Sequence, residues 1–70
     1  MKRLRNLPSF KRSIDHGQYV IEFHAWQSRE SANFATFIFE KASKGLLRHF
    51  TGSGEYTVIR QALAWCDENS

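Results

Sequence analysis

Hydrophobic and polar residues alternate along residues 18–27. Tyr19, Ile21, Phe23 and Ala25 take every second position, and the mixed set Val20, Glu22, His24 and Trp26 takes the positions between them. Because successive side chains of a β-strand point to opposite faces, this pattern predicts a strand with one apolar face. That face is the clearest candidate for the core side of a sheet.

Two further strands are predicted downstream. Apolar residues are dense in residues 34–41 and 46–51, and polar or turn-forming stretches separate the strands at 28–31 and 42–45. These connections are too short for parallel crossovers, which need a dozen or more residues. The strands are therefore expected to form an antiparallel meander.

The second strand is unusual because both of its faces are apolar. Residues 33–39 read Asn-Phe-Ala-Thr-Phe-Ile-Phe, so neither set of alternating positions is polar. A sheet in a small protein usually has one apolar and one wet face. We expect Phe34 and Ile38 to lie on the face opposite the helix, beside Val20 and Trp26. Such a face would need a cover or a partner.

The C-terminal segment predicts an amphipathic helix. Ser53 is a candidate N-cap, and Glu55 in the first turn suits the helix dipole. One half of the helical wheel is apolar and comprises Tyr56, Val58, Ile59, Ala62, Leu63, Trp65 and Cys66. So wide an apolar face can lie flat on a sheet.

The N-terminal segment allows several structures. Leu4, Leu7, Phe10 and Ile14 recur at helical spacing, but Pro8 interrupts the pattern. Since proline is tolerated in a first helical turn, a short helix over residues 8–15 is one expectation. An extended arm and a fourth strand are the others.

The predicted fold class is thus α+β. We expect a three-stranded antiparallel β-meander packed on one C-terminal α-helix, with either a short N-terminal helix or an extra strand added. Residues 1–16 would form a basic arm or short helix, and residues 17–70 a single domain.

Charge is concentrated at the N-terminus of a chain whose formal net charge is +3. The first twelve residues hold five of the ten basic side chains and none of the seven acidic ones, namely Lys2, Arg3, Arg5, Lys11 and Arg12. This asymmetry indicates contact with an anionic partner or simply a solvated terminus. These five residues are the candidate nucleic-acid contacts.

No pattern of catalytic residues is present. The three histidines lack a metal-binding spacing, and the single Cys66 falls on the apolar half of the helix. We therefore expect no enzymatic activity, metal, cofactor or small-molecule substrate. A lone thiol fits a reducing compartment, and no apolar run approaches membrane-spanning length, so a cytoplasmic protein without a membrane partner is expected.

The element order is similar to that of the DNA-binding domains of plant AP2 factors and of arm-binding phage integrases. An N-terminal helix would make it similar to double-stranded-RNA-binding domains. The resemblance implies nucleic-acid binding by the sheet or the helix start. The strands, however, carry Glu22, Glu40, Lys41 and Arg48, a nearly balanced set. No family is assigned on this layout.

Protein binding is the function that the sequence favours. Trp and Arg are enriched at interface hot spots, and the predicted contacts are Val20, Trp26, Arg29, Phe34 and Ile38. We expect a small interaction protein, such as a regulator, adaptor or inhibitor of the kind found in phages and mobile elements. Its partner would be another protein or a second copy, with nucleic-acid binding as the alternative.

Overall fold

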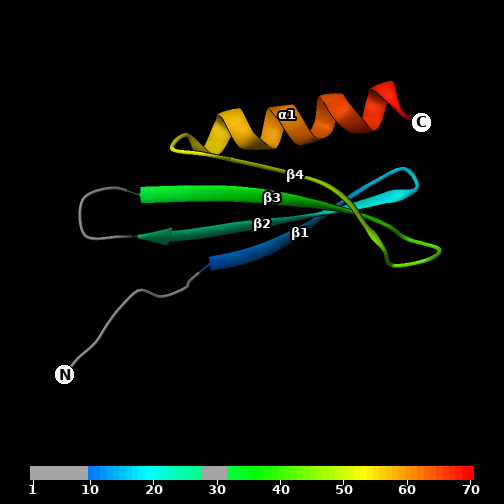
Figure 1. The fold of residues 1–70 in the computed structure, drawn as a ribbon, viewed down its shortest axis with the longest axis horizontal. Coiled ribbons are helices and arrows are strands. Elements are labelled where there is room, and N and C mark those ends of the chain that lie inside the picture. Colours follow the sequence, from blue (N-terminus) through cyan, green and yellow to red (C-terminus); the bar gives the residue numbers. More distant parts are fainter. Residues whose placement is uncertain (1–9, 28–31) are drawn as a thin grey trace.

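The computed structural model describes residues 10–27 and 32–70. The elements in chain order are β1 (Phe10–His16), β2 (Tyr19–Gln27), β3 (Ala32–Glu40), β4 (Leu46–Gly52) and α1 (Glu55–Glu68). The strands form one antiparallel sheet in the order β1-β2-β3-β4, and α1 lies along one side of it (Figure 1). The fold is therefore α+β, as predicted, with four strands in the sheet where three were expected.

The additional strand is β1, so the predicted helix over residues 8–15 is wrong for residues 10–15. Ile14 lies opposite Ile21, and His16 lies opposite Tyr19. A two-residue connection joins β1 to β2, and its first residue, Gly17, has a φ of 65°. Glycine adopts this left-handed conformation without steric cost, which suits a tight hairpin. Pairing with β2 then satisfies the backbone of a segment that has few apolar side chains.

Strand register decides which residues of β3 face the helix. Residues directly opposite each other in an antiparallel pair point to the same side. Ile38 lies opposite Ile21, and Thr36 lies opposite Phe23. The ring of Phe34 also stacks on that of Phe23, with 5.9 Å between centroids. The expected placement of Phe34 and Ile38 on the face opposite the helix is therefore wrong.

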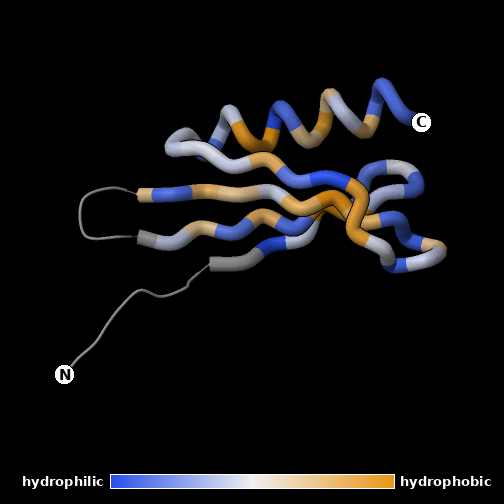
Figure 2. The backbone as a smooth tube through the Cα atoms, viewed as in Figure 1, coloured by the Kyte–Doolittle hydropathy of each residue, from blue (hydrophilic) through white to orange (hydrophobic). Residues whose placement is uncertain are grey.

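The core lies between α1 and this side of the sheet, which we call the helix face. Its buried hydrophobic residues are Tyr19, Ile21 and Phe23 of β2, Ile38 of β3, and Val58, Ala62 and Cys66 of α1. One buried polar side chain, Thr36, donates a 3.1 Å hydrogen bond to the carbonyl of Val58. Hydrophobic and hydrophilic residues alternate along the strands and along α1 (Figure 2).

The ends of α1 differ in part from the sequence prediction. The N-cap is Gly54 rather than Ser53, and no side chain caps this end. Glu55 lies in the first turn, as expected. At the other end the backbone N–H of Asn69 bonds to the carbonyls of Trp65 and Cys66, and its side-chain amide donates to Trp65 at 2.8 Å.

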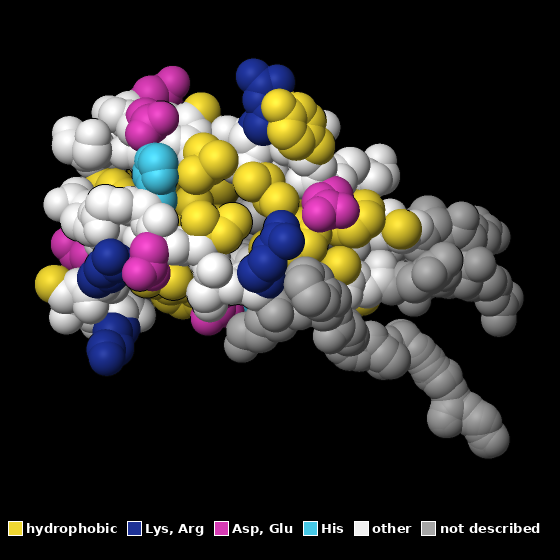
Figure 3. Space-filling model, turned by 180° about the vertical axis from the view of Figure 1, so that it is seen from behind, with side chains coloured by type: hydrophobic (Ala, Val, Ile, Leu, Met, Phe, Trp, Pro, Cys, Tyr) yellow, Lys and Arg dark blue, Asp and Glu magenta, His cyan; other side chains and the backbone are white. Residues whose placement is uncertain are grey.

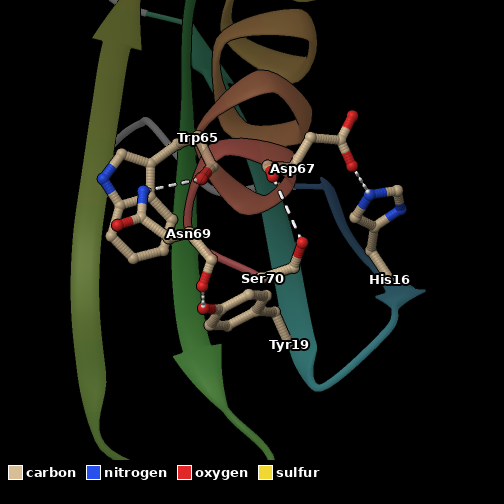
Figure 4. A network of polar contacts seen from close by, with 6 residues as sticks. All are labelled: His16, Tyr19, Trp65, Asp67, Asn69 and Ser70. Atoms are coloured by element: carbon tan, nitrogen blue, oxygen red, sulfur yellow. Dashed lines mark hydrogen bonds and ion pairs between the residues drawn. The ribbon is translucent and has the colours of Figure 1, made fainter.

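Polar contacts join α1 to the β1–β2 hairpin. His16 Nε2 lies 2.8 Å from Asp67 Oδ1, and the Tyr19 hydroxyl donates to the carbonyl of Asn69 (Figure 4). At the other end of β1, Arg12 lies 3.9 Å from Glu55. The backbone of α1 approaches β3 and β4 most closely, then β2. Side-chain contacts thus supply the main described connections between α1 and β1.

Hydrophobic side chains also gather on the side of the molecule turned away in Figure 1, with charged side chains of both signs around them (Figure 3). Ile14 and Leu63 are only partly buried where they pack against the core. The core is consequently less enclosed than that of a larger domain, as expected for 70 residues.

Candidate functional site

The side of the sheet opposite the helix face carries the candidate site, and we call it the open face. By register it comprises Val20, Glu22, His24 and Trp26 of β2, Asn33, Ala35, Phe37 and Phe39 of β3, and Leu46, His49 and Thr51 of β4, with Ser13 and Asp15 of β1 at its edge. Six of the eleven residues on β2, β3 and β4 are apolar. Trp26 is 39% exposed and Leu46 53% exposed, and no element that the structure describes packs over this side.

Three rings form a row across the middle of the open face, which we call the aromatic row. The edge of His24 meets the ring of Phe37 with 5.1 Å between centroids. On the other side, Phe37 stacks on His49 at 6.0 Å. Such pairs stabilise a sheet by cross-strand contact and hold their rings in fixed orientations. The aromatic row thus gives the open face a rigid centre that spans β2, β3 and β4.

A carboxylate lies beside the aromatic row. Glu22 Oε1 is 3.1 Å from Nε2 of His24, and both side chains are about 30% exposed. Both arginines described in the strands, Arg12 and Arg48, belong to the helix face, where they lie over the rings of Phe23 and Phe50. The centre of the open face is therefore apolar, with a mixed acid–imidazole pair and no guanidinium among its described side chains.

A hollow of about 500 Å³ opens at the end of the face near the β3–β4 turn. Its walls comprise Val20, Glu22, Phe39, Glu40, Lys41 and Lys44. Lys41 lies 3.9 Å from Asp15, whereas the Lys44 ammonium makes no ion pair within the described part of the chain. The hollow therefore combines two apolar side chains, Val20 and Phe39, with two carboxylates and two ammonium groups.

The turn that carries Lys44 has a left-handed residue at an unexpected position. Lys44, rather than Gly45, has the positive φ, at 64°. Its N–H bonds to the carbonyl of Glu40 at 2.7 Å. A non-glycine residue in this region costs roughly 1 kcal/mol. The turn thus fixes the Lys44 backbone at the hollow despite an unfavourable conformation.

The other end of the open face carries Trp26. It is six residues from Val20 on the same strand, or about 20 Å at the usual rise of a β-strand. An exposed indole at one end and a hollow at the other make the two ends of this face different in shape. The aromatic row lies between them.

The structure brings together only part of the predicted site. Val20 and Trp26 share the open face, whereas Phe34 and Ile38 belong to the helix face. Arg29, Lys2, Arg3 and Arg5 lie outside the described residues. Lys11 pairs through its backbone with His24, and Arg12 lies beside the core at 5.3 Å from the ring of Phe23.

Sequence reasoning missed the aromatic row and the hollow. The predicted placement of Phe34 and Ile38 implies the wrong face for Phe37 and Phe39, and the prediction for His24 and His49 is only that they are exposed imidazoles of a sheet face. The length of the β2–β3 connection is the feature of the sequence from which the face of Phe37 could have been predicted. An even number of connecting residues pairs odd positions of one strand with even positions of the next, which places Phe37 opposite Glu22.

Cys66 is the one thiol of the chain, and it is buried on the sheet side of α1. Burial raises the pKa of the Cys66 thiol, and the neighbouring Asp67 carboxylate raises it further. A thiol of this kind is a poor nucleophile. Within residues 10–27 and 32–70, no group of three or more His, Cys, Asp or Glu side chains is arranged to hold a metal ion.

Comparisons with known proteins give no relative. No family model, no curated protein and no solved structure matches the chain. Among the described residues, α1 is too short and too polar to cross a bilayer. The case for a function therefore depends on the open face itself.

Proposed function

We propose that the protein is a non-enzymatic interaction protein that self-associates through its open face. The observation that carries the proposal is a sheet face that holds six apolar residues on β2, β3 and β4 and that no described element covers. Monomeric proteins seldom leave so contiguous an apolar surface without a binding role.

The size of the core supports this proposal. Only eight hydrophobic residues of the described chain are buried below one-tenth exposure. Seven of them form the core on the helix face, and the eighth is Ala35 of the open face. Small domains often gain their missing stability from a partner subunit. A second copy would bury the aromatic row and turn a two-layer fold into a four-layer one.

Charge favours a second copy over an unrelated partner. The open face and its rim carry Glu22 and Asp15 as well as Lys41 and Lys44. A surface with both signs at separated positions can complement itself, as an isologous dimer requires. The assembled protein would act as a regulator, adaptor or inhibitor, and we place it in the cytoplasm.

The mass of the protein in solution tests this proposal. Sedimentation equilibrium over a micromolar to millimolar range should give a concentration-dependent dimer. Phe37→Ala should shift the curve toward the monomer, whereas Tyr56→Ala, an exposed aromatic on the far side of α1, should leave it unchanged. A monomer at every concentration would reject self-association, and a different protein bound to the open face would then be the remaining occupant.

Nucleic-acid binding is the second candidate. Its support is the cluster of five basic residues within the first twelve, together with rings on which unpaired bases could stack. It ranks second because Arg12 and Arg48 belong to the helix face. Binding to mixed DNA or RNA should weaken steeply with salt, and the triple change of Lys2, Arg3 and Arg5 to Ala should flatten that slope. Absence of binding at low salt would exclude this candidate.

A further inference from the structure

The outer edge of β4 is an unpaired strand edge within the part of the chain that the structure describes. β4 has one neighbour in the sheet, β3, so the N–H and C=O groups on its other side meet no described strand. We propose that a second copy adds its own β4 along this edge, antiparallel, so that two four-stranded sheets join into one continuous sheet. This contact is separate from the open face and goes beyond the proposed function.

The two edges of the sheet differ in how they are protected. Charged side chains on an edge strand oppose pairing with another strand. β1, the opposite edge, carries Arg12 and Asp15, which form ion pairs within the chain. After its bulge, β4 continues as the regular segment Arg48–Gly52, which holds one basic residue, no acid and no proline. The guanidinium of Arg48 lies 4.9 Å from the centre of the Phe50 ring, on the helix face. β4 is therefore the edge that a second copy can approach.

The sequence of this segment selects one register. Directly opposite residues of an antiparallel pair point to the same face, so a two-fold axis normal to the sheet passes beside a residue that pairs with its own copy. An axis at Phe50 pairs the whole regular segment, with ring opposite ring and His49 opposite Thr51. An axis at Arg48 would set two guanidinium groups opposite each other. An axis at His49 would place Thr51 against the bulge.

The position of α1 supports this pairing. The backbone of α1 lies closest to β3 and β4. Because strands are spaced about 4.8 Å apart, a helix above the space between β3 and β4 lies about 5 Å to the side of an axis at the β4 edge. The two α1 helices then lie antiparallel and about 10 Å apart, the usual distance between packed helices. Joining the sheets therefore brings the helices into contact without a change in the fold.

The side of α1 toward β4 forms this helix contact. Trp65 lies on that side, whereas Asp67, which contacts His16, lies on the side toward β1 (Figure 4). Gln61 comes four residues before Trp65, so the two side chains lie along the same side of the helix. Gln61 is exposed in the single chain and is free to meet a second copy.

A hydrogen bond gives the level of the axis along α1. Thr36 lies opposite Phe50 in the sheet and donates to the carbonyl of Val58. A helix carbonyl points toward the residues that follow it, because its own donor lies four residues later. Gln61 is therefore close to the axis and faces Gln61 of the second copy. Two amides can each donate and accept, which suits a contact between identical residues.

A disulfide at this position tests the contact in the full chain. Helices about 10 Å apart leave about 5 Å between facing Cα atoms, within the range of a disulfide. In a Cys66→Ala background, which removes the native thiol, Gln61→Cys should give about ten-fold more disulfide-linked dimer than Tyr56→Cys. Tyr56 is the matched control because it is exposed on the far side of α1. Equal yields would overturn the inference.

Charge exchange keeps the test decisive if Cys66→Ala does not fold. In a Phe37→Ala background, which weakens the open face, sedimentation measures the remaining dimer. Gln61→Glu and Gln61→Lys should each weaken it about five-fold, the scale of an exposed charge contact. An equimolar mixture of the two should recover a heterodimer. Unchanged association of both single variants would overturn the helix contact.

A second cysteine pair tests the register. In the same Cys66→Ala background, a mixture of His49→Cys and Thr51→Cys should crosslink more than either variant alone, because the axis at Phe50 sets these residues opposite each other. A mixture that crosslinks no better than the single variants would overturn this axis.

The crosslink at Gln61 also separates this inference from the proposed function. Packing through the open face puts the two α1 helices on the outer layers, where the introduced thiols cannot meet. A mass shift caused by Phe37→Ala without a crosslink at Gln61 would overturn the edge contact and leave the proposed function in place. A crosslink at Gln61 in a protein whose mass Phe37→Ala does not change would support the edge contact and reject the proposed function. Circular dichroism and thermal unfolding verify that each variant folds.

Discussion

Ile38 and Phe37 are neighbours in the chain, but they lie on opposite sides of the same sheet. Ile38 is fully buried beneath α1, whereas Phe37 lies in the aromatic row on the open face. Both side chains are large and apolar. Their difference is that the protein supplies a cover for one and, among the residues described, none for the other. Hydrophobicity alone therefore does not distinguish a folding contact from a binding surface in this protein.

The polar residues of the two faces sharpen the contrast. The helix face buries a single hydroxyl, that of Thr36, and satisfies it through the carbonyl of Val58. The open face holds a partly exposed Glu22–His24 pair and two imidazoles of the aromatic row. The helix face thus satisfies its buried polar group within the chain, whereas polar groups of the open face stay partly in contact with solvent.

The largest expected effect separates these two roles. Ile38→Ala should lower the free energy of unfolding by about 3 kcal/mol, because it removes buried atoms and leaves a cavity. Phe37→Ala should lower it by less, about 1–2 kcal/mol, when urea unfolding is measured at concentrations where the protein is monomeric, because its partly buried ring loses its contacts with His24 and His49. Equal losses would show that both faces contribute alike to the monomer. Ile38→Val, with an expected loss of about 1 kcal/mol, is the matched control.

A smaller effect is expected at the buried hydroxyl. Thr36→Val keeps the side-chain volume and removes the donor to Val58, so stability should fall by about 1 kcal/mol. Thr36→Ala should cost more because it also leaves a void. If Thr36→Val stabilises the protein instead, the hydroxyl serves register rather than stability. Urea unfolding of the three proteins in parallel makes the comparison.

Burial of the Cys66 thiol should make the stability of the protein depend on pH. Its folded-state pKa lies above the ordinary value of 9.0 because of burial and the Asp67 carboxylate. The neutral thiol is therefore favoured in the folded state. Its contribution to stability is complete below pH 9 and is lost as the pH rises above that value.

Thermal unfolding of wild type and Cys66→Ala across this range isolates the contribution, because other titrating groups are common to both. The stability difference between the two proteins should shrink as the pH rises above 9. A constant difference would contradict a buried, neutral thiol. Aromatic-disulfide reagents should also modify the folded protein far more slowly than the unfolded one.

The smallest effect is expected at the surface contact between β1 and α1. Asp67→Asn weakens the contact with His16, but the Asp67 side chain is 71% exposed. Exposed ion pairs contribute little, so the loss should be about 0.5 kcal/mol or less at low salt and smaller still at high salt. A loss as large as that of Ile38→Ala would mean that this contact holds the layers together.

Much of the fold could be predicted from the pattern of hydrophobic and polar residues. The alternation around Ile21 identified β2 with its core side, and the apolar half of residues 55–66 identified α1. Which residues of β3 face the helix could not be predicted from the strand alone, because both of its alternating sets of positions are apolar. The register with β2 determines which residues of β3 lie on which face. Because four residues connect Gln27 to Ala32, even-numbered residues of β2 lie opposite odd-numbered residues of β3.

Other features depend on tertiary context. The helical spacing that includes Ile14 favoured a helix, but the hairpin at Gly17 and pairing with Ile21 determine a strand. The hollow needs Val20 and Phe39 to lie side by side and the turn to fold Lys44 toward them. No local pattern encodes such a juxtaposition. The predicted basic contacts at Lys2, Arg3 and Arg5 stay a prediction.

The attachment of β1 has a consequence for the motions of the protein. Its described links to α1 include a side-chain contact at each strand end, Ile14 packs against the core, and β2 is its one neighbour in the sheet. Separation of β1 from β2 exposes less of the core than separation of β2 from β3. Backbone amides that bond β1 to β2 should therefore exchange with deuterium through local opening, whereas those between β2 and β3 should exchange only with global unfolding. Protection would then rise stepwise across the sheet from β1 to β3.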